Sequence, residues 1–387
     1  ETMSIDYIAT PALILNRSRL SRNADRMSKR LADMGVRLRP HMKTAKSADV
    51  ARLATKDHFG GVTVSTVAEA RYMAEKGIKD IFYAVGLSPG KVAPLAEIQA
   101  SHDAVITVLT DNADALNAVA TEAQRLETSF PVLVEVDCGG GRAGLVADDP
   151  DLIDVVKAIV AAPVLEFAGI MTHAGQSYGC NSTEEMADVA EVERATLVEV
   201  GQMLADQGFD CKTLTTGSTP TAAHARSMEG ITEARPGVYM FSDVMQAHFG
   251  WGTTDDIAVS VLATVIGHRK DLDQLLIDAG GLALSKDRGM ESRDPNIGLG
   301  VVCNTQTQPI KGLYVADSHQ EHGIVKAAEG SIIPWDDMPV GSRVRVLPVH
   351  ACMTAAAHDY YNVVDEDSDG NEDFSSLTIW QRQNGWY

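Results

Sequence analysis

The chain has 387 residues, of which 45% are hydrophobic and 22% are charged, and its formal net charge is −20. This length allows more than one compact unit, and the composition is that of a globular protein. The strong negative charge argues against nucleic acids and anionic membranes as partners, because both select a basic surface.

Targeting signals and cysteine usage indicate the cellular compartment of the protein. The sequence contains no run of about 18 apolar residues that could span a membrane, and it opens without the basic start and apolar core of a signal peptide. Its five cysteines are odd in number and scattered, and no CxxC pair occurs. These observations predict a protein of the reducing cytoplasm without a disulfide framework.

From the N-terminus to about residue 255, short β-branched runs alternate with amphipathic helical patterns. The alternation predicts a (β/α)8 barrel of the TIM type, with an open doubly wound sheet as the alternative. The expected helices are Asn16–Asp33, Val67–Lys76, Asn112–Leu126 and Thr183–Gln207, the last preceded by a capping box of Ser182 and Glu185. The expected strands are Val36–Pro40, Val62–Ser65, Ile81–Val85, Ala104–Leu109, Val132–Asp137, Phe167–Thr172, Thr213–Thr216 and Val238–Phe241.

Beyond residue 255 the pattern changes to strands without intervening helices, which predicts a separate β domain. The expected strands are Ile257–Ile266, Leu275–Ala279, Lys311–Val315, Arg343–Leu347 and Leu377–Gln381. We therefore predict an N-terminal segment, residues 1–15, that joins the β domain, a barrel over residues 16–255, and a β domain over residues 256–387. The acidic run Asp365–Gly370 is similar to a calcium loop, but position twelve is Ser376 and strands flank it, so a hairpin turn is expected.

Three clusters of reactive residues follow predicted barrel strands. Lys43, in Arg39-Pro40-His41-Met42-Lys43-Thr44, lies where catalytic groups of barrels gather, and a desolvated lysine there can form a Schiff base; a plain surface lysine is the alternative. His173 follows another strand and is either a core histidine or a pocket residue. Gly217, Ser218 and Thr219 lead into a helix, and they form either an anion site or an ordinary N-cap.

A glycine-rich segment follows the fifth predicted strand. Gly139, Gly141 and Gly144 fit the GxGxxG pattern of dinucleotide-binding enzymes. Pro150 and two aspartates place the next helix near Asp151, which is too late for that motif. We therefore interpret the segment as a flexible turn that lets Arg142 approach a ligand, and a dehydrogenase remains the weaker alternative.

A candidate metal site lies in the predicted β domain. His350 and Cys352 are two apart on an expected extended segment, so their side chains point to the same side. Imidazole and thiolate together suit zinc, and two protein ligands leave room for water or substrate. The pair could equally be two core residues. No HExxH motif occurs, and His322 lies with His319 on an expected loop.

Taken together, these motifs resemble the fold-type III pyridoxal-phosphate (PLP) enzymes, and in particular the family of D-serine dehydratases, D-threo-3-hydroxyaspartate dehydratases and D-threonine aldolases. The likeness runs through the segments already quoted and through Arg235-Pro236-Gly237-Val238-Tyr239, Asp278-Ala279-Gly280 and Gln320-Glu321-His322-Gly323. It implies an alanine-racemase-like barrel with a C-terminal β domain, a homodimer with its sites near the interface, and a D-amino acid substrate.

The resemblance also implies residue roles. Lys43 would form the Schiff base with PLP, Arg142 would approach the phenolic oxygen, His173 would line the pocket, and Tyr178 would face the pyridine nitrogen. Gly217, Ser218 and Thr219 would bind the phosphate, together with Gly237 and Val238 or Tyr239. His350 and Cys352 would hold the divalent metal, expected to be zinc. Arg288 is a candidate for a second substrate carboxylate, and His322 is a further candidate substrate residue.

The reaction expected from this resemblance is loss of water from a D-3-hydroxy amino acid, which gives a 2-keto acid and ammonia. The His-x-Cys pair favours dehydration, because D-threonine aldolases carry His-x-Asp instead. Two alternatives remain open: aldol cleavage to glycine and an aldehyde, and a PLP-binding homeostasis protein without turnover. The β domain argues against the second, because such proteins are usually a barrel alone.

Overall fold

The computed structural model describes residues 4–387 and divides the chain into two compact units, which we treat separately. One, here called the β unit, comprises Glu1–Asp25 and Val238–Arg382; the other, the barrel unit, comprises Arg26–Gly237 and Gln383–Tyr387. These bounds differ from the predicted ones at residues 16–25 and 238–255, which lie in the β unit, and at residues 383–387, which lie in the barrel unit. No helix among the described residues is long and apolar enough to cross a membrane.

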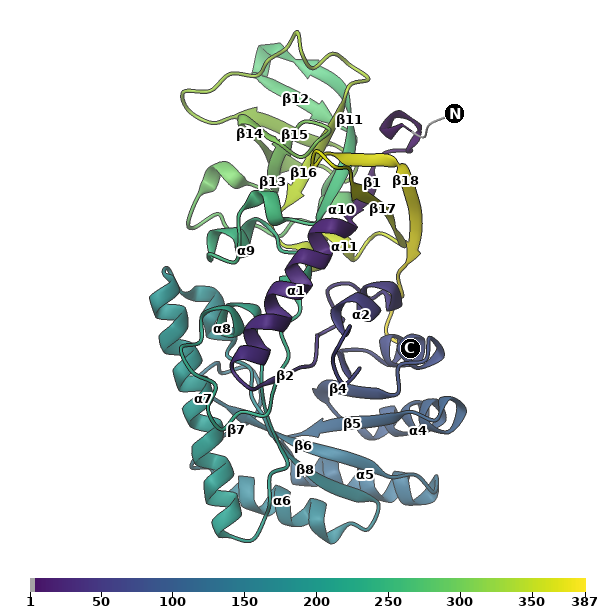
Figure 1. The fold of residues 1–387 in the computed structure, drawn as a ribbon, viewed down its shortest axis with the longest axis vertical. Helices are drawn as coiled ribbons and strands as arrows, with labels where there is room; N and C mark the ends of the chain where they lie inside the picture. The colour runs from purple at the N-terminus through teal and green to yellow at the C-terminus, as the bar shows by residue number, and fades with distance from the viewer. Residues whose placement is uncertain (1–3) are drawn as a thin grey trace. The chain divides into compact units, whose positions relative to one another are not determined.

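Eight parallel strands form the sheet of the barrel unit (Figure 1). They lie in the order β2-β10-β9-β8-β6-β5-β4-β3, and a parallel bridge between His41 and Thr63 joins the two ends. The strands are β2 (Arg37–Leu38), β3 (Val62–Val64), β4 (Asp80–Gly86), β5 (Val105–Thr110), β6 (Phe130–Asp137), β8 (Leu165–Met171), β9 (Thr213–Thr216) and β10 (Glu233–Ala234), with β7 (Leu145–Val146) paired to β6. The predicted TIM-type barrel is confirmed.

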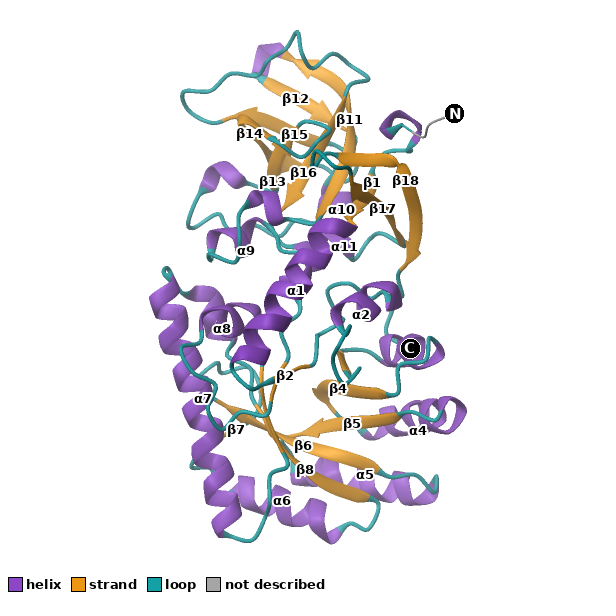
Figure 2. Ribbon diagram, viewed as in Figure 1, coloured by secondary structure: helices purple, strands orange, loops and turns teal. Residues whose placement is uncertain are grey.

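Helices follow most of these strands, as Figure 2 shows. Side-chain caps fix their starts: Thr66, Asn112 and Ser182 each accept a hydrogen bond from a backbone N–H in the first turn. The helices are α1 (Arg17–Asp33), α2 (Ala48–Ala54), α3 (Val67–Glu75), α4 (Pro89–His102), α5 (Ala113–Arg125), α6 (Asp151–Ala161), α7 (Thr183–Asp206) and α8 (Thr219–His224). All four predicted helices are confirmed to within a residue at each end.

One predicted strand is wrong. Val238–Phe241 does not form the eighth strand, because Val238–Met240 is a 3-10 helix. The eighth position is taken by Glu233–Ala234, which pairs in parallel with both β2 and β9. Glutamate and alanine are poor strand formers, so the sequence pattern does not predict this strand. Its place depends on tertiary contacts, among them the ion pair of Arg39 Nε with Glu233 Oε1 at 2.9 Å.

The β unit contains a nine-stranded sheet in the order β12-β15-β14-β13-β16-β11-β1-β17-β18. A further pairing of β12 with β11 closes six of these strands on themselves. All pairs are antiparallel except β1 with β17. The strands are β1 (Ala12–Asn16), β11 (Val259–Arg269), β12 (Gln274–Ile277), β13 (Gly300–Cys303), β14 (Pro309–Ser318), β15 (Gly323–Ala327), β16 (Arg343–Pro348), β17 (Tyr360–Glu366) and β18 (Glu372–Gln381).

Short helices interrupt this unit, contrary to the expectation of strands alone. They are α9 (Val244–His248), α10 (Gly281–Leu284) and α11 (Ala351–Ala355). The 3-10 helices of the chain are Ile5–Tyr7, Gly175–Gly179, Val238–Met240, Thr254–Asp256, Lys270–Leu272 and Pro295–Ile297. The expected hairpin turn after Glu366 is present, because β17 and β18 pair antiparallel and Asp367 accepts two backbone N–H bonds of the turn.

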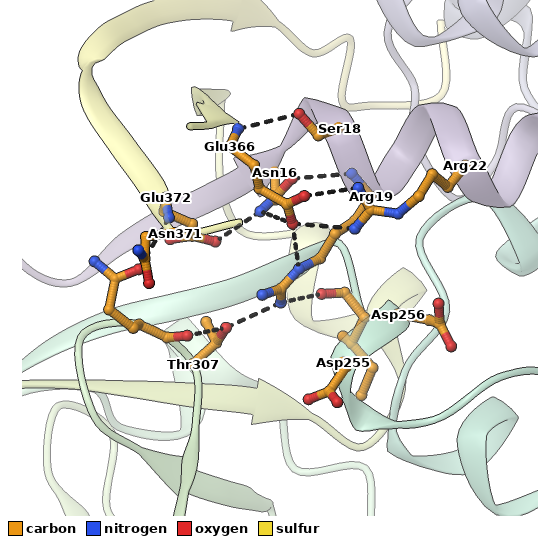
Figure 3. Close-up of polar contacts among 12 residues, drawn as sticks. Asn16, Ser18, Arg19, Arg22, Asp255, Asp256, Thr307, Glu366, Asn371 and Glu372 are labelled. Atoms are coloured by element: carbon orange, nitrogen blue, oxygen red, sulfur yellow. Dashed lines mark hydrogen bonds and ion pairs between the residues drawn. The ribbon is translucent and has the colours of Figure 1, made fainter. Parts of the chain in front are cut away.

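A network of charged side chains ties the start of α1 to the β17–β18 hairpin within the β unit (Figure 3). Glu366 accepts hydrogen bonds from Asn16, Arg19 and Arg22. Arg19 Nη1 also donates to Thr307 at 2.9 Å, and Asn16 reaches Glu372 at 3.2 Å. The N-terminal segment is thus held in the sheet by side chains as well as by the pairing of β1 with β11 and β17.

The ion pair between Arg345 and Glu372 is the most deeply buried in this network. The two side chains are each 1% exposed, and Arg345 Nη1 lies 2.6 Å from Glu372 Oε2. We expect Arg345→Leu to lower the free energy of unfolding by about 3–5 kcal/mol, because it leaves a buried carboxylate without its cation. Urea unfolding measures the change.

The exposed pair Lys29–Asp33, with side chains 77% and 62% exposed, provides the matched control. Lys29→Gln is expected to change stability by less than about 0.5 kcal/mol. An Arg345→Leu protein that unfolds at the same urea concentration as the Lys29→Gln protein would contradict the stabilising role of the buried pair.

Candidate active site

The turn that carries Lys43 follows β2 directly. Met42 N–H donates to Thr63 at 2.8 Å, and Lys46 N–H closes the turn on Met42 at 2.6 Å. Lys43 is exposed, whereas Lys46 Nζ lies 2.9 Å from Glu69 Oε1, whose side chain is fully buried. The nearby Lys46 amine is therefore engaged in an ion pair, and Lys43 is the lysine of this turn with an exposed side chain.

Two histidines lie close to the positive charges of the barrel unit. Burial lowers the pKa of His173 to about 3, with further lowering by Arg142, Lys43 and Arg235, although its hydrogen bond to Gly217 acts in the opposite direction. Burial and the same three cations hold the pKa of His41 well below its usual value. Both imidazoles are therefore neutral at physiological pH. The field that keeps them neutral attracts anions.

A hydrogen bond fixes the tautomer of His173. Its Nδ1 hydrogen-bonds the carbonyl oxygen of Gly217, so Nδ1 carries the proton and Nε2 can accept. This bond also joins the segment after β8 to the segment after β9. His173 is half-buried, as is Tyr178 in the neighbouring 3-10 helix Gly175–Gly179.

Asp137 organises the loop that carries Arg142. Its Oδ1 accepts the backbone N–H groups of Gly139, Gly140 and Gly141 at 2.9, 2.8 and 3.2 Å. Gly144 is required at φ +100°, and a Cβ there would lie 2.8 Å from Asp137 N. Helix α6 begins at Asp151, as expected, so the glycines form a loop and not a dinucleotide-binding turn.

The Arg142 side chain is 57% exposed, and its Nη2 lies 3.4 Å from Glu135 Oε1. This contact is long for an ion pair. The geometry leaves the guanidinium accessible to a ligand.

The proposed phosphate-binding segment lies at the start of α8. Ser218 is the N-cap, and its Oγ accepts a hydrogen bond from Thr221 N at 3.1 Å, so the ordinary cap expected as one alternative is present. Glycine keeps the neighbouring backbone clear of side chains. A Cβ at Gly237 would lie 2.9 Å from the His41 carbonyl oxygen, and one at Gly217 would lie 3.1 Å from Arg235 Cβ.

These features fit PLP, an anionic ligand that needs an amine and a phosphate cradle. The cationic groups Lys43, Arg142 and Arg235 act together on the two neutral histidines. Gln176 Oε1 is buried and has no hydrogen-bond partner within residues 4–387, which leaves an acceptor for a ligand donor. In the barrel unit, Lys43 and Arg142 thus lie close enough to His173 to lower its pKa, and His173 bonds to Gly217 of the expected phosphate site.

The remaining expected cofactor residue, Tyr239, lies in the β unit by the division of the chain. It is fully buried in the 3-10 helix Val238–Met240, and Trp251 Nε1 donates to its carbonyl oxygen at 3.0 Å.

His350 and Cys352 lie together in the β unit, but not on an extended segment as expected. His350 is the N-cap of α11, and Cys352 lies in its first turn, because the chain bends into a helix after Pro348. His350 Nδ1 lies 2.7 Å from Asp287 Oδ2. This carboxylate fixes the ring and leaves Nε2 for a metal, as the outer partners of metal-bound histidines do.

Acidic groups around His350 favour a positive charge at this position. Burial lowers its pKa, but hydrogen bonds to Asp287 and Cys352 outweigh burial and raise the pKa to about 11. Asp243 is fully buried, and burial raises its pKa to about 6; its Oδ2 accepts the Ala351 N–H at 2.9 Å. Within residues 4–387, no set of three or more histidine, cysteine or acidic side chains is arranged to hold a metal ion, so the pair would bind metal with outside ligands.

The two expected substrate residues are placed less favourably. Arg288 Nη2 lies 3.1 Å from Asp317 Oδ1, and its Nη1 lies 3.7 Å from Glu291. A substrate carboxylate would compete with both. His322 is exposed on the turn after Ser318, and its carbonyl accepts the His319 N–H at 2.9 Å.

Several residues of these sites were not identified from the sequence. Asp287 lies one position before Arg288, and a carboxylate in that short polar loop was the available signal. The other site residues that were not identified from the sequence are His41, Arg235 and Glu193. Glu193 had a clear signal, because it is a charged residue on the apolar stripe of α7. A charge on a buried stripe indicates a specific partner.

Fold and chemistry define a class: an alanine-racemase-type barrel with a Lys-bearing turn and a cluster of cationic side chains, accompanied by a β unit with a His-Cys pair. Comparison with known proteins agrees with this class. Residues 15–244 match the alanine racemase N-terminal domain, and residues 258–364 match the putative serine dehydratase domain. The chain belongs to the fold-type III family of PLP enzymes that contains these two domains.

Curated relatives cover nearly the whole chain. A D-threo-3-hydroxyaspartate dehydratase from Delftia sp. (strain HT23) is 36% identical, over 97% of this chain and 98% of that protein. A D-serine dehydratase from Dictyostelium discoideum is 31% identical over the same shares of the two chains. A 3-hydroxy-D-aspartate aldolase from Paracoccus denitrificans (strain Pd 1222) is 29% identical, over 93% of this chain and 89% of that protein.

Solved structures also show similarity to a D-threo-3-hydroxyaspartate dehydratase. The Delftia sp. HT23 dehydratase superposes with a TM-score of 0.92 at 36% identity, over 98% of this chain and 99% of that one. Two alanine variants of a D-threo-3-hydroxyaspartate dehydratase also superpose, one of a histidine and one of a cysteine two positions later, and the cysteine variant is described as metal-free. The spacing of those two residues equals that of His350 and Cys352.

Proposed function

We propose that this chain is a PLP- and divalent-metal-dependent lyase that dehydrates a D-3-hydroxy amino acid, such as D-threo-3-hydroxyaspartate or D-serine, to a 2-keto acid and ammonia. The observation that carries the choice of dehydration is the His350–Cys352 pair with its Asp287 partner. Full-length similarity to two dehydratases supports it.

PLP, when bound, would store the electrons released as a bond at Cα breaks. Lys43 would hold the cofactor and, once displaced by substrate, remove the Cα proton as a general base. Arg142 would bind the phenolic oxygen, and Tyr178 would face the pyridine nitrogen without protonating it. Gly217, Ser218 and Thr219, with Gly237 and Tyr239, would bind the phosphate.

The neutral state of His173 contributes to this scheme. Because its Nδ1–H is donated to Gly217, Nε2 remains an acceptor in the pocket. A neutral imidazole accepts a hydrogen bond from a ligand hydroxyl or ammonium without adding a further positive charge. His173 would therefore line the pocket as a hydrogen-bonding group that does not change charge during the reaction.

The metal, expected to be zinc, would be held by His350 and Cys352. It would act as a Lewis acid that makes the substrate β-hydroxyl a better leaving group. Asp287 would keep His350 in the tautomer whose Nε2 binds metal. Arg288 and His322 remain candidate substrate residues. The contacts of Arg288 and His322 do not favour either residue over the other.

Aldol cleavage is the second candidate function, supported by the similarity to a 3-hydroxy-D-aspartate aldolase. A cysteine at position 352 argues against it, since the aldolases of this family are expected to carry aspartate there. A PLP-homeostasis role is disfavoured because the serine dehydratase domain is present. We also propose that the protein is a cytoplasmic homodimer.

Product analysis tests the reaction. The PLP- and zinc-loaded protein is supplied separately with D-threo-3-hydroxyaspartate, D-serine and D-threonine, with and without EDTA. We expect ammonia with oxaloacetate or pyruvate, lost with EDTA and restored by zinc. Glycine plus an aldehyde would show an aldolase. A rate unaffected by EDTA would remove the metal from the proposal.

Replacing Lys43 tests the cofactor assignment. Lys43→Ala is expected to lose the visible imine absorption band and to lower kcat at least about 10³-fold, because the amine that holds PLP and takes the proton is absent. Lys46→Arg is the matched control, since arginine preserves the ion pair with Glu69 and should keep the band. A Lys43→Ala protein that retains the band would refute the assignment.

Replacing Asp287 tests the outer partner of the metal pair. Asp287→Asn keeps the shape but weakens the bond that orients His350, so we expect zinc affinity to fall about 10–100-fold. Competition with a chromogenic chelator measures the affinity. Asp317→Asn is the control, because it removes a carboxylate of the same unit that pairs with Arg288. Equal zinc affinity of the two variants would contradict the role of Asp287.

A further inference from the structure

Helix α7 contains a charged residue where its pattern calls for an apolar one. Glu193 is 1% exposed and lies on the stripe that includes Ala190 and Leu197. Burial of a carboxylate is costly unless specific hydrogen bonds compensate. The mechanism above gives Glu193 no role, so its partners require an explanation.

The partners of Glu193 come from two separate active-site segments. Its Oε1 accepts the backbone N–H of Ala174 at 3.1 Å and that of Gly217 at 3.0 Å. Ala174 follows His173, at the end of β8. Gly217 precedes Ser218, at the end of the neighbouring strand β9. One carboxylate oxygen thus fixes the backbone on both sides of the candidate phosphate site.

Other hydrogen bonds tie the same two segments to each other. His173 Nδ1 donates to the Gly217 carbonyl oxygen. Ser177 Oγ donates to the Ala174 carbonyl at 2.8 Å and lies 3.2 Å from Ser218 Oγ. Thr221, capped by Ser218, also hydrogen-bonds Glu193. The segments therefore form a closed network in which Glu193 is the acceptor at the centre.

The charge of Glu193 is balanced locally. Burial raises its pKa, whereas the hydrogen bonds from Gly217, Thr221 and Ala174 and the charge of Arg235 lower it. Since both backbone bonds end on Oε1, a neutral amide oxygen at that position could accept them equally well. The two backbone N–H groups thus need an acceptor oxygen at this point, whether or not it carries a charge.

We propose that Glu193 is a positioning residue that holds the His173 segment and the Gly217–Thr219 segment in the conformation that binds the phosphate of PLP. The inference rests on the proposed function and deepens it. Glu193 would strengthen binding of the cofactor's phosphate group, and it would take no part in the chemistry at Cα. Its effect should therefore depend on whether the ligand carries a phosphate.

Pyridoxal, which lacks the phosphate, provides the discriminating ligand. Apoprotein is titrated with PLP and with pyridoxal, and the imine absorption band gives each Kd. Glu193→Ala leaves two buried N–H groups without an acceptor, so we expect PLP to bind about 10–100-fold more weakly and pyridoxal within about threefold of wild type. Glu193→Gln keeps an acceptor oxygen and should bind both ligands within about threefold of wild type. Inorganic phosphate should compete with PLP more weakly in Glu193→Ala than in wild type.

Two further variants provide an alternative to Glu193→Ala and a control. Glu193→Asp is one methylene shorter and cannot reach both N–H groups, so it should show the phosphate-dependent loss if Glu193→Ala does not fold. Glu199→Ala changes an exposed glutamate of the same helix and should bind both ligands as wild type does.

Three outcomes would overturn the inference. Equal weakening of PLP and pyridoxal would show a general structural role, an unchanged PLP Kd in Glu193→Ala and Glu193→Asp would show no role, and a Glu193→Gln protein as impaired as Glu193→Ala would show that charge matters. Failure of the wild-type protein to form the imine band with either ligand would instead refute the proposed function.

Discussion

Closure of the eight-stranded parallel sheet is the constraint on which the barrel unit depends. The chain after β2 leaves its strand at Leu38 and bonds to Thr63 on both sides, through Met42 N–H and the Pro40 carbonyl. These bonds and the His41–Thr63 bridge join the first and last strands of the sheet. The turn with Lys43 begins at this junction. A lysine on a closed ring of strands is held more rigidly than one on an open sheet edge, and catalytic geometry needs that rigidity.

The barrel unit also contains a buried positive charge. Arg235 is 4% exposed and donates to Thr215 Oγ1 at 2.6 Å and to the Thr172 carbonyl at 2.7 Å. Burial lowers its pKa to about 10, although the carboxylates Glu233, Glu193 and Glu135 act to raise it. The guanidinium remains charged, and its field helps to keep His41 and His173 neutral. Burial, together with the charges of Lys43, Arg142 and Arg235, therefore keeps both imidazoles neutral, and the three cations favour an anionic ligand.

In the β unit, two carboxylates hold the start of α11 and the His350 ring in place. Asp243 accepts the Ala351 and Gln246 N–H groups, at 2.9 and 2.8 Å, and so fixes the start of α11. Asp287 fixes the His350 ring. These carboxylates place the two donors by way of backbone and ring contacts.

The sequence by itself determined the alternation of strands and helices, the change of pattern near residue 255, and the motifs around Lys43, Arg142, His173 and His350, because periodicity and turn chemistry are local properties. It did not reveal β10, since Glu233–Ala234 is a strand only through its neighbours β2 and β9. Only the tertiary structure decided that Lys46 is paired with Glu69, that Asp287 orients His350, and that Glu193 joins two loops. These are contacts between residues far apart in the chain. Their energy depends on burial and on distance, which no local pattern encodes.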